Sequence, residues 1–228
     1  MSNSALIQSS LAKKYWMAAT GLFLCLFLIG HLAGNLQLLA SGEEALLAFN
    51  EYAKFMTTNP AVKILSYLTY ISILFHAIDG IVLTVQNRRA RPKGYAYSKP
   101  SANSLWTSRN MALLGTIILV FIILHMRQFW YVMHWGPIGV DSAGNKDLYT
   151  VTVTAFTDGS FGLIYTIGYV VAMIAVALHL SHGFQAAFQS LGLRTNKLKK
   201  SIYTVGYIFS ILVPLLFAII PVYIHLTH

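Results

Sequence analysis

Four of the eight histidines in this 228-residue chain lie deep inside long apolar segments, with one histidine in each segment. They are His31, His76, His125 and His179. An ionisable side chain within hydrocarbon costs about 2–3 kcal/mol, so packing alone is a poor explanation for one such residue in each of four segments. Neutral imidazole is a good ligand for haem iron, whereas zinc would require three or four ligands together. The four histidines therefore indicate haem ligation.

Depth in the membrane separates these histidines into two pairs. Counted from the segment ends that adjoin basic loops, His31 and His125 lie about 24 Å in, at about 1.5 Å per residue. On the same count, His76 and His179 lie about 15–17 Å in. Two imidazoles at one level on different helices can bind one iron from both sides. We predict an inner haem on His76 and His179, and an outer haem on His31 and His125.

Small residues beside the histidines would allow a flat porphyrin to lie against the helices. A glycine follows His31, His76 and His179 by three or four residues, on the same helix face. The alternative is that small residues serve only the close approach of transmembrane helices, and both roles are compatible. The glycines expected to pack against haem are Gly30, Gly34, Gly80 and Gly183.

Five apolar segments must position these residues, and each reaches the ~20 residues that span a bilayer. They cover residues 15–40, 62–86, 111–133, 161–190 and 202–224. The chain is 56% hydrophobic and only 10% charged, against about 25% charged residues in a soluble domain. Strand-like alternation is absent from the segments, and only helices or closed barrels satisfy their backbone in lipid. We predict an all-α membrane protein of one domain, residues 1–228, with five transmembrane helices, of which the first four form a haem-binding bundle.

Two connections between the segments have informative patterns. The stretch before the second segment has a helix-forming composition, with Asn59-Pro60 as the expected break. Residues 147–156, DLYTVTVTAF, alternate β-branched side chains, which suits a strand. A short surface helix would also fit this stretch, and the two alternatives stay open.

The net charge of +9 is unevenly distributed between the two sides of the membrane. Six of the seven acidic residues lie on one side, and twelve of the sixteen basic residues lie on the other. The positive-inside rule predicts a cytoplasmic N-terminus and an external C-terminus. This placement argues against nucleic acid as a partner; the basic loops reflect topology alone or also form a docking face for a soluble partner. The twelve basic residues are Lys13, Lys14, Arg88, Arg89, Arg91, Lys93, Lys99, Arg109, Arg194, Lys197, Lys199 and Lys200.

Two motifs and the histidine order together resemble a known family. The first span contains GHLAGN at 30–35, the fourth contains HLSHG at 179–183, and the first four of five spans each hold one deep histidine. This pattern resembles the diheme cytochrome b membrane anchor of succinate dehydrogenases and quinol:fumarate reductases, in its five-helix type. The resemblance covers essentially the whole chain. It implies an inner haem held by spans two and four and an outer haem held by spans one and three, the pairing that the depth count also predicts.

The resemblance implies a function in a respiratory chain, in a bacterial-type cytoplasmic membrane. A flavoprotein subunit would interconvert succinate and fumarate, and an iron–sulfur subunit would exchange electrons with the anchor. Both would dock on the cytoplasmic face. Two b haems would then relay electrons to or from a membrane quinone, in this type usually menaquinone. The chain itself would carry no catalytic residue for succinate, only electron transfer and quinone chemistry.

The chain departs from one fumarate-reductase version of this family. In that version a glutamate two residues before the fourth ligand takes part in proton transfer. The matching position here is Ala177. The direction of the reaction is therefore left open.

Other polar residues in the spans are candidates for supporting roles. Asp79, Arg127 and His182 are candidates for contacts with haem propionates or ligands, because propionates are anionic and favour cationic partners. Asp79 could instead reach towards the loop arginines, and Arg127 does not share the face of His125. His182 could also replace His179 as the ligand, being one turn away. The candidates for a quinone pocket near the outer end are Asn35, Gln37, Trp130, His134 and Trp135.

Two other functions are compatible with intramembrane histidines. One is a diheme cytochrome b subunit of another quinone-linked complex, such as a hydrogenase or formate dehydrogenase. The other is a transporter in which the histidines relay protons. An absorbance spectrum separates the haem proteins from the transporter.

Overall fold

A computed structural model describes residues 10–90 and 104–228 of the chain. Within these ranges, five helices are long and apolar enough to cross a membrane, and none of the residues forms an extended strand. The prediction of five membrane spans in an all-α protein is thus confirmed, with span ends that differ by no more than four residues. Three basic residues of the topology prediction lie outside the described ranges: Arg91, Lys93 and Lys99.

The spans are built mostly from single long helices. The first span is α2 (Ser10–Asn35) with the 3-10 turn η1 (Leu36–Leu39), and the third joins α7 (Met111–His125), the π-helix η2 (Met126–Trp130) and α8 (Tyr131–Trp135). The second, fourth and fifth are α4 (Pro60–Arg89), α10 (Gly159–Ser190) and α11 (Lys199–Thr227). The short helix α6 (Trp106–Arg109) precedes α7. Large apolar side chains along these helices stay exposed, as the lipid-facing surface of a bundle requires.

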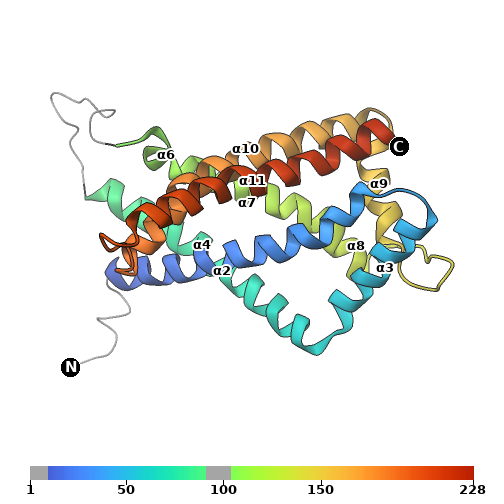
Figure 1. Ribbon diagram of the computed structural model, residues 1–228, viewed down its shortest axis with the longest axis horizontal. Helices are drawn as coiled ribbons and strands as arrows, with labels where there is room; N and C mark the ends of the chain where they lie inside the picture. Colours follow the sequence, from blue (N-terminus) through green and yellow to red (C-terminus); the bar gives the residue numbers. More distant parts are fainter. Residues whose placement is uncertain (1–9, 91–103) are drawn as a thin grey trace.

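The first four spans contact one another in a ring. α2 packs against α4 and α10, and α7 packs against the same two helices. α2 therefore lies diagonally opposite α7, and α4 lies diagonally opposite α10. α11 is outside this ring, along α10 and α2 (Figure 1).

The two ends of the bundle differ in charge and in the segments that cover them. The basic end holds the start of α2, the end of α4 and the turn from α10 to α11 (Figure 1). The acidic end holds α3 (Glu43–Thr58), α9 (Leu148–Thr157) and the C-terminus. A cluster of buried apolar side chains closes the acidic end, and it includes Leu38, Phe49, Phe156 and Ile224.

Both informative connections are helical. α3 confirms the helix expected before Asn59-Pro60. The Asn59 side chain caps α4 by accepting hydrogen bonds from the backbone N–H groups of Ala61 (3.0 Å) and Val62 (3.3 Å). The DLYTVTVTAF stretch also forms a helix, α9, because the Asp147 carboxylate caps its first turn by accepting from the Thr150 N–H at 3.0 Å.

One asparagine fixes the loop that leads into α9. Asn50 on α3 is fully buried, and its amide nitrogen donates to the carboxylates of Asp141 (3.2 Å) and Asp147 (3.0 Å). Its amide oxygen accepts from the Tyr149 N–H at 2.9 Å. A buried polar side chain is stable only when its groups are paired, and here the pairing ties α3 to α9.

Candidate functional site

The structure brings His31 and His125 together at the acidic half of the ring. His31 is on α2 and His125 ends α7, so the pair spans one diagonal of the bundle. Their ring centroids are 5.8 Å apart, and the ring planes are nearly perpendicular, at 87°. We call these two residues the outer pair. Aromatic rings surround it at centroid distances of 4.9–6.3 Å from one another or from the pair: Phe27, Phe121, Phe129, Tyr169 and Phe217.

Hydrogen bonds orient the outer pair from its Nδ1 side. The Tyr169 hydroxyl lies 3.1 Å from Nδ1 of His125 and donates its own hydrogen to Oε1 of Gln128 at 2.9 Å. The Asn35 amide nitrogen lies 3.3 Å from Nδ1 of His31 and donates to the His31 carbonyl oxygen at 2.7 Å. Asn35, a quinone candidate from the sequence, is therefore a neighbour of the His31 ring.

His76 and His179 meet across the other diagonal, nearer the basic end, and we call them the inner pair. Their ring centroids are 6.2 Å apart, with an interplanar angle of 68°. Nδ1 of His76 donates to the Met17 carbonyl oxygen at 3.2 Å and lies 3.3 Å from the Thr20 hydroxyl. Within residues 10–90 and 104–228, Nδ1 of His179 is the buried side-chain nitrogen or oxygen without a hydrogen-bond partner.

Two glycines that the sequence interpretation missed border the inner pair. A Cβ on Gly21 of α2 would lie 3.1 Å from Cε1 of His76, and one on Gly115 of α7 would lie 3.9 Å from Cε1 of His179. The sequence contains a signal for these glycines, because each stands ten residues before the histidine of its own helix, at the same spacing in α2 and α7. Ten residues of helix rise about 15 Å, so both helices give the same separation between the two pairs. This separation is larger than the difference of about 7–9 Å between the depths counted from the sequence, because that count depended on the chosen segment ends.

The donor set of each pair fits two-sided binding of one metal atom. A metal that takes a nitrogen from each ring at about 2 Å needs centroids roughly 6 Å apart. With Nδ1 of His76 and His125 engaged in hydrogen bonds, Nε2 is the nitrogen left for a metal, the usual division for a ligating histidine. No group of three or more His, Cys, Asp or Glu side chains in the described part of the chain could hold a metal ion. Each pair supplies two histidines, fewer than the four ligands of a usual structural zinc site.

The four predicted haem-packing glycines have different surroundings. Nothing lies within 4 Å of a Cβ built on Gly30, and only Met17 at 4.0 Å approaches one on Gly80. A Cβ on Gly183 would lie 3.9 Å from the His179 ring. At Gly34 the Tyr52 ring of α3 fills the space, so that glycine serves the contact between α2 and α3.

Of the three propionate candidates, His182 and Asp79 are half-buried and Arg127 is exposed. It is the His179 ring that stands beside His76, while His182, half-buried, lies one turn nearer the basic end. Asp79 is also half-buried, one turn from His76. Arg127 is exposed and belongs to the π-helix η2.

Three of the five quinone candidates gather in one aromatic cluster. The Trp130 ring is 4.7 Å from His134 and 4.9 Å from Trp135 between centroids. The indole N–H of Trp130 donates to the Tyr70 hydroxyl at 2.7 Å, which joins η2 to α4. The hydrogen bond of the Gln37 side chain is made outside this cluster: its amide donates to the Gly34 carbonyl oxygen at 3.1 Å.

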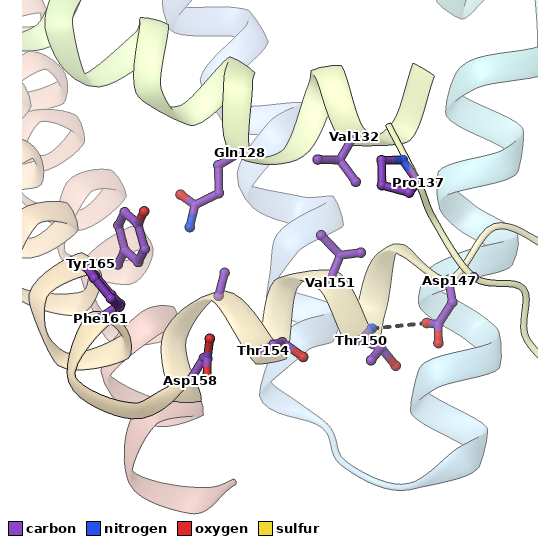
Figure 2. A pocket seen from close by; sticks show the side chains of 12 residues that line it. Gln128, Val132, Pro137, Asp147, Thr150, Val151, Thr154, Asp158, Phe161 and Tyr165 are labelled. Carbon is purple, nitrogen blue, oxygen red and sulfur yellow. Dashed lines mark hydrogen bonds between the residues drawn. The ribbon is translucent and has the colours of Figure 1, made fainter. Parts of the chain in front are cut away.

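An open cavity of about 440 Å³ lies elsewhere at the acidic end, between the third span and the α9–α10 segment (Figure 2). Gln128 and Val132 reach it from one side, and Thr154, Asp158 and Phe161 from the other. None of the five sequence-based quinone candidates is among its lining residues. Its lining combines apolar side chains with polar groups, among them the carboxylates of Asp147 and Asp158.

Gln128 and Tyr169 are the functional candidates that sequence reasoning missed at the outer pair. Tyr169 carries the same signal as the two glycines, since it stands ten residues before His179 on α10. Gln128 has no such signal, because its direction depends on the π-helix η2. No family model, curated protein or solved structure matches the chain, so interpretation of the site depends on its own residues.

Proposed function

We propose that this chain is the membrane anchor of a succinate:quinone oxidoreductase and holds two b haems. His76 and His179 would bind the inner haem, and His31 and His125 the outer haem. One observation carries the proposal: four histidines from four spans meet as two pairs, each across a diagonal of one helix ring, about 15 Å apart along the bundle.

The cofactor and the protein would contribute different parts of the function. Haem iron with two imidazole ligands supplies one-electron transfer. The protein's residues hold the four rings at two levels, orient His76 and His125 through Nδ1, and surround all four with apolar helices. Hydrogen bonding at Nδ1 sets both the ring orientation and the basicity of the opposite nitrogen.

The basic end supports a docking role for soluble partners. Arg88 and Arg89 end α4, Lys199 and Lys200 begin α11, and all four are exposed. We propose that the iron–sulfur subunit docks at this end, on the cytoplasmic side, and that the flavoprotein subunit binds through it. The inner pair is the nearer of the two pairs to this end, which suits entry of electrons there.

The cavity beside Gln128 supports a quinone site at the opposite end. Its polar groups include the Gln128 amide and two threonine hydroxyls, and Val132, Val151 and Phe161 supply apolar surface. A quinone ring needs both kinds of contact. We propose this cavity for the quinone head group, with menaquinone as the species that the family resemblance implies.

The decisive experiment is a reduced-minus-oxidised absorbance spectrum of the purified complex, with haem content and succinate:quinone activity measured on the same sample. We expect b-type bands, two haems per chain, a flavin-bearing subunit and activity. A sample without b-type bands would reject the haem proposal and favour proton transport by the histidines. Two haems without a flavin subunit would favour the cytochrome of another quinone-linked complex, such as a hydrogenase.

A further inference from the structure

We propose that Tyr169 and Gln128 are positioning residues that hold His125 and set the reduction potential of the outer centre. The inference deepens the proposed function and rests on it, since it concerns how strongly His125 would donate to a bound haem. It arises from a hydrogen-bonded chain that runs from His125 through Tyr169 to Gln128 at the wall of the cavity.

The direction of this chain follows from the count of hydrogens. Tyr169 has one hydroxyl hydrogen and donates it to Oε1 of Gln128 at 2.9 Å. Its oxygen is then the acceptor for Nδ1 of His125 at 3.1 Å. His125 therefore carries its hydrogen on Nδ1 and presents the lone pair of Nε2. An acceptor at Nδ1 raises the basicity of the ligating nitrogen.

Packing keeps the Tyr169 hydroxyl in this place. Its ring makes edge contacts with Phe121 (4.9 Å between centroids) and Phe156 (5.0 Å), at angles of 85° and 86°. Edge-to-face packing of this kind is favourable for aromatic rings. The hydroxyl is thus held by α7 and α9 while its backbone belongs to α10.

The π-helix supplies the other end of the chain. Gln128 is three residues after His125, within η2, and its side chain points towards the α9–α10 side of the cavity (Figure 2). π-Helical turns are frequent at functional sites. Here the irregular turn connects the cavity to the ligand of the outer pair through two hydrogen bonds.

The inner pair offers an internal comparison within the same molecule. Nδ1 of His179 is buried without a hydrogen-bond partner, whereas Nδ1 of His125 has the Tyr169 hydroxyl. A change at Tyr169 should therefore alter the outer centre and leave the inner centre as it is.

The test is a redox titration of both haems in the purified complex carrying Tyr169→Phe, Gln128→Leu or Gln128→Glu, with Tyr207→Phe as the control. Tyr207 is an exposed tyrosine on α11. Tyr169→Phe removes the acceptor at Nδ1, so the oxidised outer haem loses stabilisation and its potential moves to a more positive value. Gln128→Leu shifts the potential less, in the same direction. Gln128→Glu keeps an acceptor oxygen for the Tyr169 hydroxyl and causes no shift to a more positive value.

The outcomes separate this inference from the proposed function. Loss of the outer haem in Tyr169→Phe with the inner haem retained would also support a role of Tyr169 in positioning His125. The two Gln128 variants would then show the direction in which the outer potential shifts. Two haems with an unchanged outer potential in Tyr169→Phe and Gln128→Leu would overturn the inference and leave the anchor proposal intact. A wild-type complex without b haem would instead refute the anchor proposal itself.

Discussion

The outer pair lies among aromatic rings, whereas the inner pair lies between two glycines. Around His31 and His125 the neighbours are Phe, Tyr and Asn side chains, and the buried apolar cluster with α3, α9 and α11 closes that end. Around His76 and His179, Gly21 and Gly115 replace side chains. The same residue type therefore lies among aromatic rings in one half of the bundle and beside small residues in the other.

Removing a ligand should have the largest effect, and it tests whether the two pairs are separate. We expect His76→Ala and His179→Ala to abolish the same haem, the inner one, and to leave the outer haem in place. His31→Ala and His125→Ala should do the reverse, because each proposed haem iron would lose one of its two imidazoles. Haem content and redox titration of the four variants give the answer. If His76→Ala and His179→Ala removed different haems, the diagonal pairing would be wrong.

Adding bulk beside the inner pair should have the next largest effect. In Gly21→Val, the new Cβ would lie 3.1 Å from the His76 ring and the added methyl groups would displace that ring. We expect loss of most of the inner haem and retention of the outer haem, measured by optical spectra of the purified variant. Gly168→Val is the matched control, since no atom lies within 4 Å of a Cβ at that position in α10. Equal losses in both variants would contradict a specific role for Gly21.

Removing the Asn50 side chain, which links α3 to α9 at the acidic end, should lower the stability of the protein without loss of either haem. Asn50→Ala removes the amide that pairs with the half-buried carboxylates of Asp141 and Asp147 and leaves the buried Tyr149 N–H without its acceptor, at a cost of about 1–3 kcal/mol. Thermal unfolding in detergent measures the loss. The control is Glu51→Ala, at the exposed neighbouring position on α3. Hydrogen exchange should rise in α9 and remain unchanged at the basic end; a rise at the basic end would argue against a local role.

Acidification should have a smaller effect on stability, through the Asp147 carboxylate that Asn50 binds. Burial raises the pKa of Asp147, but hydrogen bonds from Asn50 and Thr150 outweigh it and hold the pKa below its ordinary value. A lowered folded pKa contributes stability above the ordinary value of about 3.9, which is lost as pH falls through the folded pKa. We expect unfolding temperatures to fall on acidification below about pH 4, and Asp147→Asn to flatten that part of the profile. An identical acid limb in the variant would assign the effect to other carboxylates.

Much of the architecture followed from the sequence because hydrocarbon imposes strict rules. Segment length and apolar content predicted the five spans, and depth alone grouped the histidines that the structure brings together. Details that depend on packing could not be predicted. Tyr52 takes the space beside Gly34, and Asn35 turns to His31, because α3 and η1 fold over that end. The helical state of DLYTVTVTAF depends on the Asp147 cap and on Asn50, which is distant in sequence.

The π-helix explains why Gln128 was missed. A regular α-helix predicts which side chains share a face with His125, and Gln128 three residues later would have been considered only as its neighbour. η2 widens the turn directly after His125 and redirects the side chains that follow. The two-step connection to Tyr169 is therefore visible only in three dimensions.

The diagonal arrangement also orders events during synthesis of the chain. The outer pair is complete once the third span has been made, because its last residue is His125, whereas the inner pair must wait for His179 in the fourth span. Chains emerge from the N-terminus, so both histidines of the outer pair have been made before the inner pair is complete. A nascent chain arrested after span three would already contain one ring pair, and Gly115 would still lack its neighbour His179.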